Sequence, residues 1–405
     1  MRSLLYLIGY LIGFMQRPIY LDCQATTPVD ERVLAVMLPY FRESFGNAAS
    51  VGHFYGWEAA SAVKLAREAI ANSIHAIPEE IVFTSGATEA NNLALKGVAE
   101  AYHQQGRHII TVQTEHSAIL DPCAYLQSIG FEITYLSVKA DGLIDLQELE
   151  QAIRPDTILV SVMAANNEIG VLQPIAEIGQ LCRDRAPQQQ VLFHTDAAQA
   201  IGKIPLDVNA MHIDLMSLTA HKIYGAKGIG ALYVRRRHPR VKLAPQLHGG
   251  GHERGMRSGT LYTPQIVGFA KALDIAIAAQ VAEQQQALKL REYLWGKLSE
   301  LNGIILNGHP TQRLAGNLNV SFRDPDGQAL NGAKLMLALQ PIVAVSSGSA
   351  CSSAKPEPSH VLKALGHSQA LAYASIRFGI GRFNTLAEIE KVANHVVDSV
   401  RFLQT

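Results

Sequence analysis

Cysteine is scarce in this 405-residue chain, which contains four: Cys23, Cys123, Cys182 and Cys351. They form no CxxC pair and show no spacing typical of a metal site, which argues against a disulfide framework and against a structural metal ion. A large chain with so little cysteine suits a reducing compartment, where a reactive thiol acts alone. We therefore expect a cytoplasmic protein without a resident metal.

Net charge is also absent, because 35 Lys and Arg residues balance 35 Asp and Glu residues. A neutral chain has no overall field to attract nucleic acid or an anionic membrane, so neither is an expected direct partner. With 48% hydrophobic and 17% charged residues, the composition is that of a compact globular enzyme. The length exceeds the size at which one hydrophobic core stops growing, which predicts two domains.

The first residues form a short apolar segment behind Arg2. The run from Leu4 to Met15 is too short for a comfortable transmembrane helix. No small-residue cleavage site follows it, as a signal peptide would require. We interpret residues 1–18 as a dispensable extension, since the folded pattern begins at Ile19.

Apolar strand patterns alternate with helical patterns through most of the chain. Strands are predicted at 81–84, 108–113, 133–138, 158–164, 191–196 and 213–218, with helices at 58–75, 119–128, 146–153 and 175–183 between them. This alternation predicts an α/β fold with a mostly parallel sheet that helices cover on both faces.

The pattern changes in the last third of the chain, where a smaller α+β domain is predicted. Its elements are a strand at 317–322, a helix at 327–339 and a strand at 342–346. We assign a large domain to residues 19–275 and a small domain to residues 276–405. Residues 19–30 are expected to form an extended arm of the large domain that packs on the small one.

The stretch DLMSLTAHKIYGAKGIG, residues 214–230, places Lys222 where a buried strand meets a glycine-rich loop. A lysine at such a junction can be desolvated, which makes its amine available for a Schiff base with an aldehyde cofactor. The hydroxyls of Ser217 and Thr219 and the imidazole of His221 are candidate ligands for a phosphate on that cofactor. A lone lysine beside a turn is more often a solvated surface residue, so this interpretation depends on the rest of the chain.

Polar residues follow several predicted strands, at the ends where ligands bind in parallel sheets. They are Thr88, His116, Asn166, Asn167, Asp196, Gln199 and Lys222. The segment SGATEANN (85–92) opens a helix with small residues and predicts a phosphate site at the helix N-terminus. A Schiff-base lysine, a carboxylate for a ring nitrogen and a phosphate site together describe a pyridoxal phosphate site. Taken singly, Asp196 and His116 are as well explained as helix caps.

Two further segments are unusual. SSGSACSSA (346–354) surrounds Cys351 with small residues, which predicts a flexible loop and an exposed thiol able to approach the cofactor. An incidental surface cysteine is an equally good interpretation of this segment alone. HGGGHERGMRSGT (248–260) is a glycine-dense loop too rich in Arg, His and Thr to be a simple connection.

Together these motifs resemble those of the cysteine desulfurases, pyridoxal phosphate enzymes of the class V aminotransferase fold family (type I, aspartate aminotransferase-like). The resemblance runs from about Ile19 nearly to the end of the chain. It is carried by ATTP (25–28), FGN (45–47), TSGATEANN (84–92), TEH (114–116), NNEIG (166–170), HTDAAQ (194–199), AHKIYGAKGIG (220–230), HGGGHERGMRSGT (248–260) and SSGSAC (346–351). The last motif resembles the long-loop, first group of the family.

The resemblance implies a role for each matching residue. Lys222 would form the Schiff base, Cys351 would carry a persulfide, and His116 would stack on the cofactor ring and transfer a proton. The phosphate would contact Ala87, Thr88, Thr219, Ala220 and His221, and also Thr260 of the partner subunit in a homodimer with shared sites. Asn167 and Gln199 would bond O3′, Asp196 would pair with the ring nitrogen, and Asn47 and Arg377 would bind the substrate carboxylate.

The implied reaction converts L-cysteine into L-alanine and leaves a persulfide on Cys351. The sulfur would pass to an iron–sulfur scaffold protein or another acceptor. It would serve iron–sulfur cluster assembly and, as a second use, the thiolation of tRNA. Cys351 would at most ligate a cluster transiently during transfer. Members of the family often continue past the position of Thr405 into a tail that docks the scaffold, so the acceptor stays open.

Three rival functions remain at this point. A pyridoxal-phosphate-dependent cystine or cysteine C–S lyase, or a class V aminotransferase, would need Lys222 but no thiol on a loop. A non-catalytic scaffold with the same fold is disfavoured, because Lys222, Asp196, His116 and Cys351 are all present.

Overall fold

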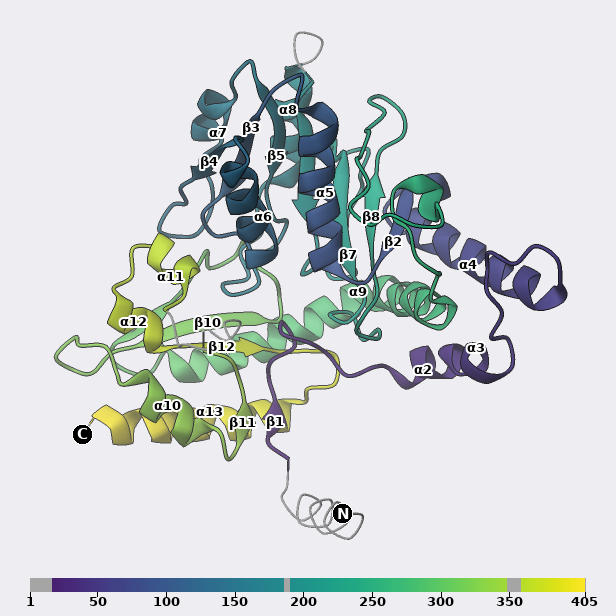
Figure 1. The fold of residues 1–405 in the computed structure, drawn as a ribbon. Helices are drawn as coiled ribbons and strands as arrows, with labels where there is room; N and C mark the ends of the chain where they lie inside the picture. The colour runs from purple at the N-terminus through teal and green to yellow at the C-terminus, as the bar shows by residue number, and fades with distance from the viewer. Residues whose placement is uncertain (1–16, 186–189, 348–357, 405) are drawn as a thin grey trace, which may run out of the picture.

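A seven-stranded sheet organises the larger part of the molecule (Figure 1). The computed structural model describes residues 17–185, 190–347 and 358–404. The strands are β2 (Ile81–Thr84), β3 (His108–Val112), β4 (Glu132–Leu136), β5 (Thr157–Ser161), β6 (Leu192–Asp196), β7 (Leu215–Thr219) and β8 (Gly230–Val234), in the order β2-β8-β7-β6-β5-β3-β4. Within this sheet β8 alone runs opposite to the other six strands, which confirms the predicted mostly parallel sheet.

The antiparallel strand β8 lies between β2 and β7. Because it opposes both neighbours, β2 and β7 point the same way as β3, β5 and β6. The carboxyl ends of these five strands therefore lie at one edge of the sheet.

Helices cover both faces of this sheet, so its inner strands are buried along their whole length and do not alternate polar and apolar residues. On one face, α5 (Ala87–Tyr102) and α6 (Ser117–Ser128) share a hydrophobic cluster with the strands. The other face packs on α2 (Glu31–Met37), α4 (Phe54–Asn72), α7 (Leu146–Ala152), α8 (Ile175–Asp184) and the first half of α9 (Thr263–Leu298). Short segments α3 (Pro39–Arg42), η1 (Pro78–Glu80) and η2 (Glu253–Gly255) complete this part.

The smaller part is built on an antiparallel sheet with the order β12-β10-β9. Its elements are β9 (Ile304–Leu306), β10 (Asn317–Phe322), α10 (Gly332–Leu339), β11 (Val343–Ala344), α11 (His360–Ala364), α12 (Gln369–Tyr373), β12 (Ser375–Gly379) and α13 (Leu386–Gln404). Helix α10 begins later than predicted, because residues 324–327 form a turn and Asn331 caps the helix by accepting from the N–H of Lys334.

Helix α9 connects the two parts. Its first half, with Phe269 and Leu273, lies in the core of the large part, while Leu290 and Leu294 belong to the core of the small part. The boundary proposed after residue 275 therefore falls inside a continuous helix. Among the described helices, α9 alone is long and apolar enough to cross a membrane, but it packs against α2, α4 and α13 as a core helix does.

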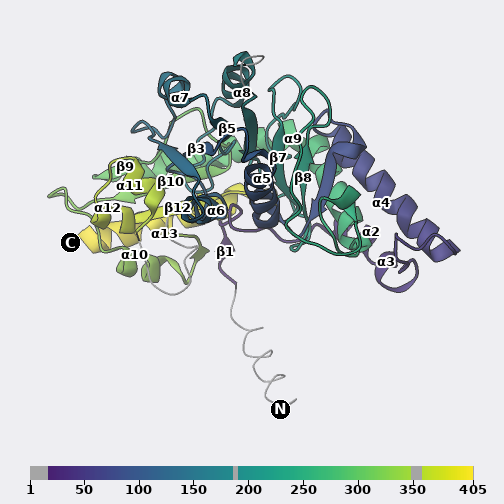
Figure 2. The same ribbon diagram turned by 45° about the horizontal axis from the view of Figure 1, so that its top comes forward.

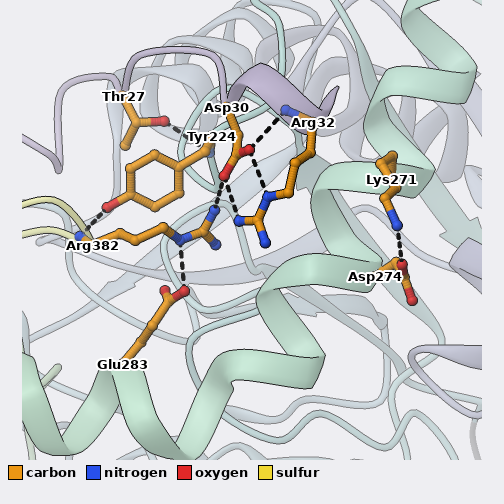
Figure 3. A network of polar contacts seen from close by, with 8 residues as sticks. All are labelled: Thr27, Asp30, Arg32, Tyr224, Lys271, Asp274, Glu283 and Arg382. Carbon is orange, nitrogen blue, oxygen red and sulfur yellow. Dashed lines mark hydrogen bonds and ion pairs between the residues drawn. The ribbon is translucent and has the colours of Figure 1, made fainter. Parts of the chain in front are cut away.

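The N-terminal arm lies against both parts (Figures 1 and 2). Strand β1 (Ile19–Tyr20) pairs in parallel with β11 of the small part. Further along the arm, the N–H of Thr27 donates to the carbonyl of His221, beside Lys222. Figure 3 shows the end of the arm, where Asp30 accepts from Arg382 Nη1 at 2.8 Å and Arg382 Nε donates to Glu283 of α9 at 2.6 Å. The arm thus ties the small part to the loop that carries Lys222.

Candidate active site

A cavity of about 440 Å³ lies at the sheet edge where the five strands end. Ten of the residues predicted for the site line it: Ala87, Thr88, His116, Asn167, Asp196, Gln199, Thr219, His221, Lys222 and Arg377. They come from the ends of β2, β3, β5, β6 and β7 and from the small part's β12. The convergence expected from the sequence is therefore present in the fold, while the individual roles stay predictions.

Asp196 is held by two neighbours at the end of β6. It is 6% exposed, its Oδ1 accepts from the N–H of Ala198 at 2.8 Å, and its Oδ2 accepts from Asn91 Nδ2 at 2.7 Å. These two donors fix the orientation of the carboxylate. Asn91 was not predicted for the site; its signal in the sequence is its place in TEANN, and it is fully buried on α5.

His116 is both a helix cap and a wall of the cavity. Its Nδ1 accepts from the N–H of Ala118 at 3.0 Å, so the neutral ring carries its proton on Nε2. Burial lowers the pKa of His116, and the charge of Lys222 lowers it further against the opposing effect of Asp196. The ring is therefore neutral at pH 7 and has a defined N–H donor.

The N-terminus of α5, where a phosphate site was predicted, lies at the wall of this cavity. Gly86 precedes the helix with φ +152°, a conformation that L side chains rarely adopt, and no side chain caps the helix. The first N–H groups of Ala87 and Thr88 thus have no partner inside the helix and lie at its positive end. Burial first, and then the charges of Lys222, Lys227 and Lys203, lower the pKa of His221 to about 4.

Two residues expected at the phosphate, Ser217 and Ala220, do not line the cavity. Ala220 is fully buried, does not line the cavity, and its N–H donates to the carbonyl of Ile229 at 3.3 Å. The fully buried hydroxyl of Ser217 contacts His194 Nε2 at 3.0 Å, on the neighbouring strand. Ser217 lies two residues before Thr219, about 7 Å further from the sheet edge.

Arg377 enters the cavity from the small part, 4% exposed. Its Nη2 donates to Asp22 Oδ1 at 2.6 Å and its Nη1 donates to the carbonyl of Asn167 at 2.8 Å. Its Nε has no hydrogen-bond partner among the described residues. Asp22 was not predicted; it orients the guanidinium and is itself held by the hydroxyl of Ser346 at 2.8 Å.

Gln199 lies between the arm and a buried lysine. Its Nε2 donates to the carbonyl of Gln24 at 2.8 Å, and its Oε1 accepts from Lys203 Nζ at 3.2 Å. One hydrogen of the Gln199 amide is left for the predicted bond to the cofactor.

Two further predicted residues, Asn47 and Thr260, do not line this cavity. Asn47 and Thr260 are exposed elsewhere, and Asn47 Oδ1 accepts from the N–H of Ala49 at 2.9 Å. Thr260 was predicted to act in the site of a second subunit. Cys351 lies outside the described residues.

Comparisons with known proteins show which family this chain resembles over its length. Residues 19–392 match the aminotransferase class V family. A cysteine desulfurase IscS from Tolumonas auensis is 54% identical over 388 residues, which cover 95% of this chain and 93% of that protein. A solved NifS-like protein superposes with a TM-score of 0.87 at 37% identity, covering 95% of this chain and all of the other. A structure of SspA in complex with cysteine gives a TM-score of 0.78 at 39% identity, covering 91% of this chain and 100% of that one.

The fold and the site define a class V aminotransferase, since the family match spans most of the chain. Cysteine desulfurases from a bacterium, a plant and human are 54%, 54% and 52% identical to this chain over 95%, 96% and 97% of its length. The chain therefore belongs to the cysteine desulfurase family, and the resemblance stated from the motifs is confirmed.

Proposed function

We propose that this cysteine desulfurase holds pyridoxal phosphate in the cavity at the sheet edge, with Lys222 as the attachment point. The observation that carries the proposal is that Lys222, Asp196 and His116 leave three different strands and line one cavity. The cavity walls fit the cofactor because Oδ1 of both Asn167 and Asn91 is buried without a partner among the described residues. When bound, pyridoxal phosphate supplies an electron sink for negative charge on the substrate carbon.

The chain's own residues then have distinct tasks. Asp196, oriented by Asn91, keeps a ring nitrogen protonated. His116 presents its Nε2–H to the cavity, and the N-terminus of α5 binds the phosphate group. Arg377 is pre-oriented by Asp22 and binds the carboxylate of L-cysteine. Lys222 Nζ takes the proton from the substrate Cα.

The sulfur leaves L-cysteine through Cys351. The Cys351 thiolate attacks the substrate sulfur, the C–S bond breaks, and its electron pair stays with the carbon skeleton, which is protonated to L-alanine. The transferred sulfur remains on Cys351 as a persulfide and passes to an acceptor, such as an iron–sulfur scaffold protein, with tRNA thiolation as a second outlet. This part of the proposal rests on the SSGSAC motif.

A second copy of the chain is the partner that the surface supports. Large apolar side chains are exposed along α2, α3, the start of α4 and nearby: Leu34, Leu38, Phe41, Phe45, Val51, Phe54, Tyr55, Trp57 and Tyr262. Two rings of this set meet edge to face, with the ring centres of Phe41 and Tyr262 6.1 Å apart. Figures 1 and 2 place α2, α3 and α4 at the end of the molecule opposite the C-terminus. Exposed apolar side chains of this number support an interface with a second copy, and Asn47 and Thr260 lie close in sequence to members of the set.

We assign the enzyme to the cytoplasm. The three described cysteines, Cys23, Cys123 and Cys182, are buried and unpaired, as in proteins of a reducing compartment.

The experiment is product analysis with purified holoenzyme and L-cysteine. Alanine together with a persulfide supports the proposal, whereas pyruvate identifies a C–S lyase. Cys351→Ala should keep the visible absorbance of the bound cofactor and lose the persulfide. Cys182→Ala, which removes a buried thiol in the core, is the matched control and should keep both. A persulfide that survives in Cys351→Ala refutes the role of this thiol.

A further inference from the structure

Lys203 lies behind the wall of the active-site cavity, four residues after Gln199. Gln199 lines that cavity, whereas Lys203 lines a second one, of about 230 Å³, where the arm, helix α9 and the small part meet. The backbone of Lys203 is held on both sides. Its N–H donates to the carbonyl of Ala200 at 2.9 Å, and its carbonyl accepts from Gln284 Nε2 on α9. No step of the proposed reaction uses Lys203.

The side-chain amide of Gln199 lies between a pure donor and a pure acceptor. It is 2% exposed, its Oε1 accepts from Lys203 Nζ at 3.2 Å, and its Nε2 donates to the carbonyl of Gln24 at 2.8 Å. A protonated lysine amine can only donate, and a backbone carbonyl can only accept. A flipped amide would therefore lose both hydrogen bonds, so these two neighbours together fix one orientation.

The charge of Lys203 strengthens this arrangement. Burial lowers the pKa of Lys203 to about 8, and the charge of Lys222 has the next largest effect, so the amine is protonated at pH 7. Its charge also reaches the first cavity, since it contributes, after burial, Lys222 and Lys227, to the lowered pKa of His221. A charged donor makes a stronger hydrogen bond than a neutral one, and hydrogen bonds in a chain polarise one another. The bond to Oε1 therefore makes the amide N–H of Gln199 a better donor.

We propose that Lys203 is a positioning residue for the reaction, which fixes the Gln199 amide so that its remaining N–H, and not its oxygen, faces O3′ of the cofactor. This inference rests on the proposed placement of pyridoxal phosphate beside Gln199. Without the donor at position 203, one of the two restraints on the amide is lost. The amide can then turn and place its oxygen against O3′, where two acceptors repel each other.

The first test is an absorbance titration of the apoenzyme with pyridoxal phosphate. Lys203→Met keeps an unbranched apolar side chain but removes the donor, and the dissociation constant should rise about fivefold, which corresponds to the loss of one net hydrogen bond. Lys203→Arg keeps a charged donor, and the second cavity leaves room for it, so it should bind as the wild type does. Lys271→Met is the matched control, since Lys271 on α9 donates to Asp274 at 2.8 Å and lines neither cavity. Its dissociation constant should equal that of the wild type.

A double-mutant cycle separates positioning from a general structural role. Gln199→Met should raise the dissociation constant, and adding Lys203→Met to it should change the constant no further, because Lys203 acts through Gln199. Single effects that multiply in the double variant, or a rise in Gln199→Met with none in Lys203→Met, overturn this inference alone. An unchanged constant in Gln199→Met overturns the placement of O3′ beside Gln199 as well.

A second measurement needs no variant, so it stands even if these variants fail to fold. Neutron crystallography of the wild-type holoenzyme in heavy water places the deuterium atoms of both side chains. A Gln199 amide deuterium that faces O3′, with a deuterium of Lys203 Nζ directed at Gln199 Oε1, supports the inference. The amide oxygen of Gln199 facing O3′ overturns it.

Discussion

The buried ion pair between Arg67 and Glu253 gives a sharp test of how the 248–260 loop is held. Arg67 Nη2 donates to Glu253 Oε1 at 2.6 Å and Nη1 to Oε2 at 2.8 Å, and the side chains are 12% and 2% exposed. Glu253 Oε2 also accepts from the N–H of Phe83 at 2.7 Å. Glu253 itself has φ +50°, so the pair fixes a strained turn on the way to Thr260.

The expected loss of stability follows from this geometry. Glu253→Leu leaves the charge of Arg67 buried and unpaired, and breaking a buried pair in this way costs about 3–5 kcal/mol. Arg67 keeps two contacts in this variant. Its Nη1 donates to the carbonyl of Ile81, and its guanidinium lies 4.5 Å from the centre of the Phe83 ring. We therefore expect Glu253→Leu to lower the free energy of unfolding by about 4 kcal/mol. The double variant Arg67→Met/Glu253→Leu buries no charge, so it should be more stable than the sum of its single variants by at least about 2 kcal/mol.

The assay is urea unfolding of the apoenzyme followed by circular dichroism, with midpoints compared at equal slope. Glu132→Ala, which breaks the exposed pair with Arg154, is the control and should cost less than about 1 kcal/mol. A cost below about 1 kcal/mol for Glu253→Leu, or strict additivity in the double variant, would refute the reasoning.

Three further predictions concern the site and the partner. Asn91→Leu removes the amide that donates to the aspartate at the end of β6, and since a hydrogen bond to a charged group is worth about 1.5–3 kcal/mol, the dissociation constant of pyridoxal phosphate should rise about 10- to 150-fold. An unchanged constant in an absorbance titration of apoenzyme would contradict this. Burial, and after it the charge of Lys222, lower the pKa of His116, so Lys222→Ala should raise that pKa in the apoenzyme. NMR titration of the His116 ring measures the change. An unchanged pKa would show that the charge of Lys222 does not act on His116. Phe54→Glu, on the exposed apolar surface, should give monomers in light scattering, while Leu337→Glu on α10 should stay dimeric; equal masses would reject the assigned interface.

Much of the site was predictable because its parts are local. Lys222 follows a buried strand and precedes glycines, and His116 opens a helix after another strand. Such patterns fix element type from periodicity alone. Parallel strands also bring their carboxyl ends to one edge, which is why residues as distant in sequence as Thr88 and Lys222 could be expected in one cavity.

The contacts that orient these side chains were not predictable. The ion pair between Asp22 and Arg377 joins residues 355 positions apart, and Asn91 meets Asp196 over 105 positions. The same holds for Ser217, whose hydroxyl faces His194 on the neighbouring strand. The sequence by itself determined which elements form and which residues end them, since both depend on neighbours along the chain. Only the tertiary structure decided which side chains pair, because strand register and the docking of the arm and small part set those distances.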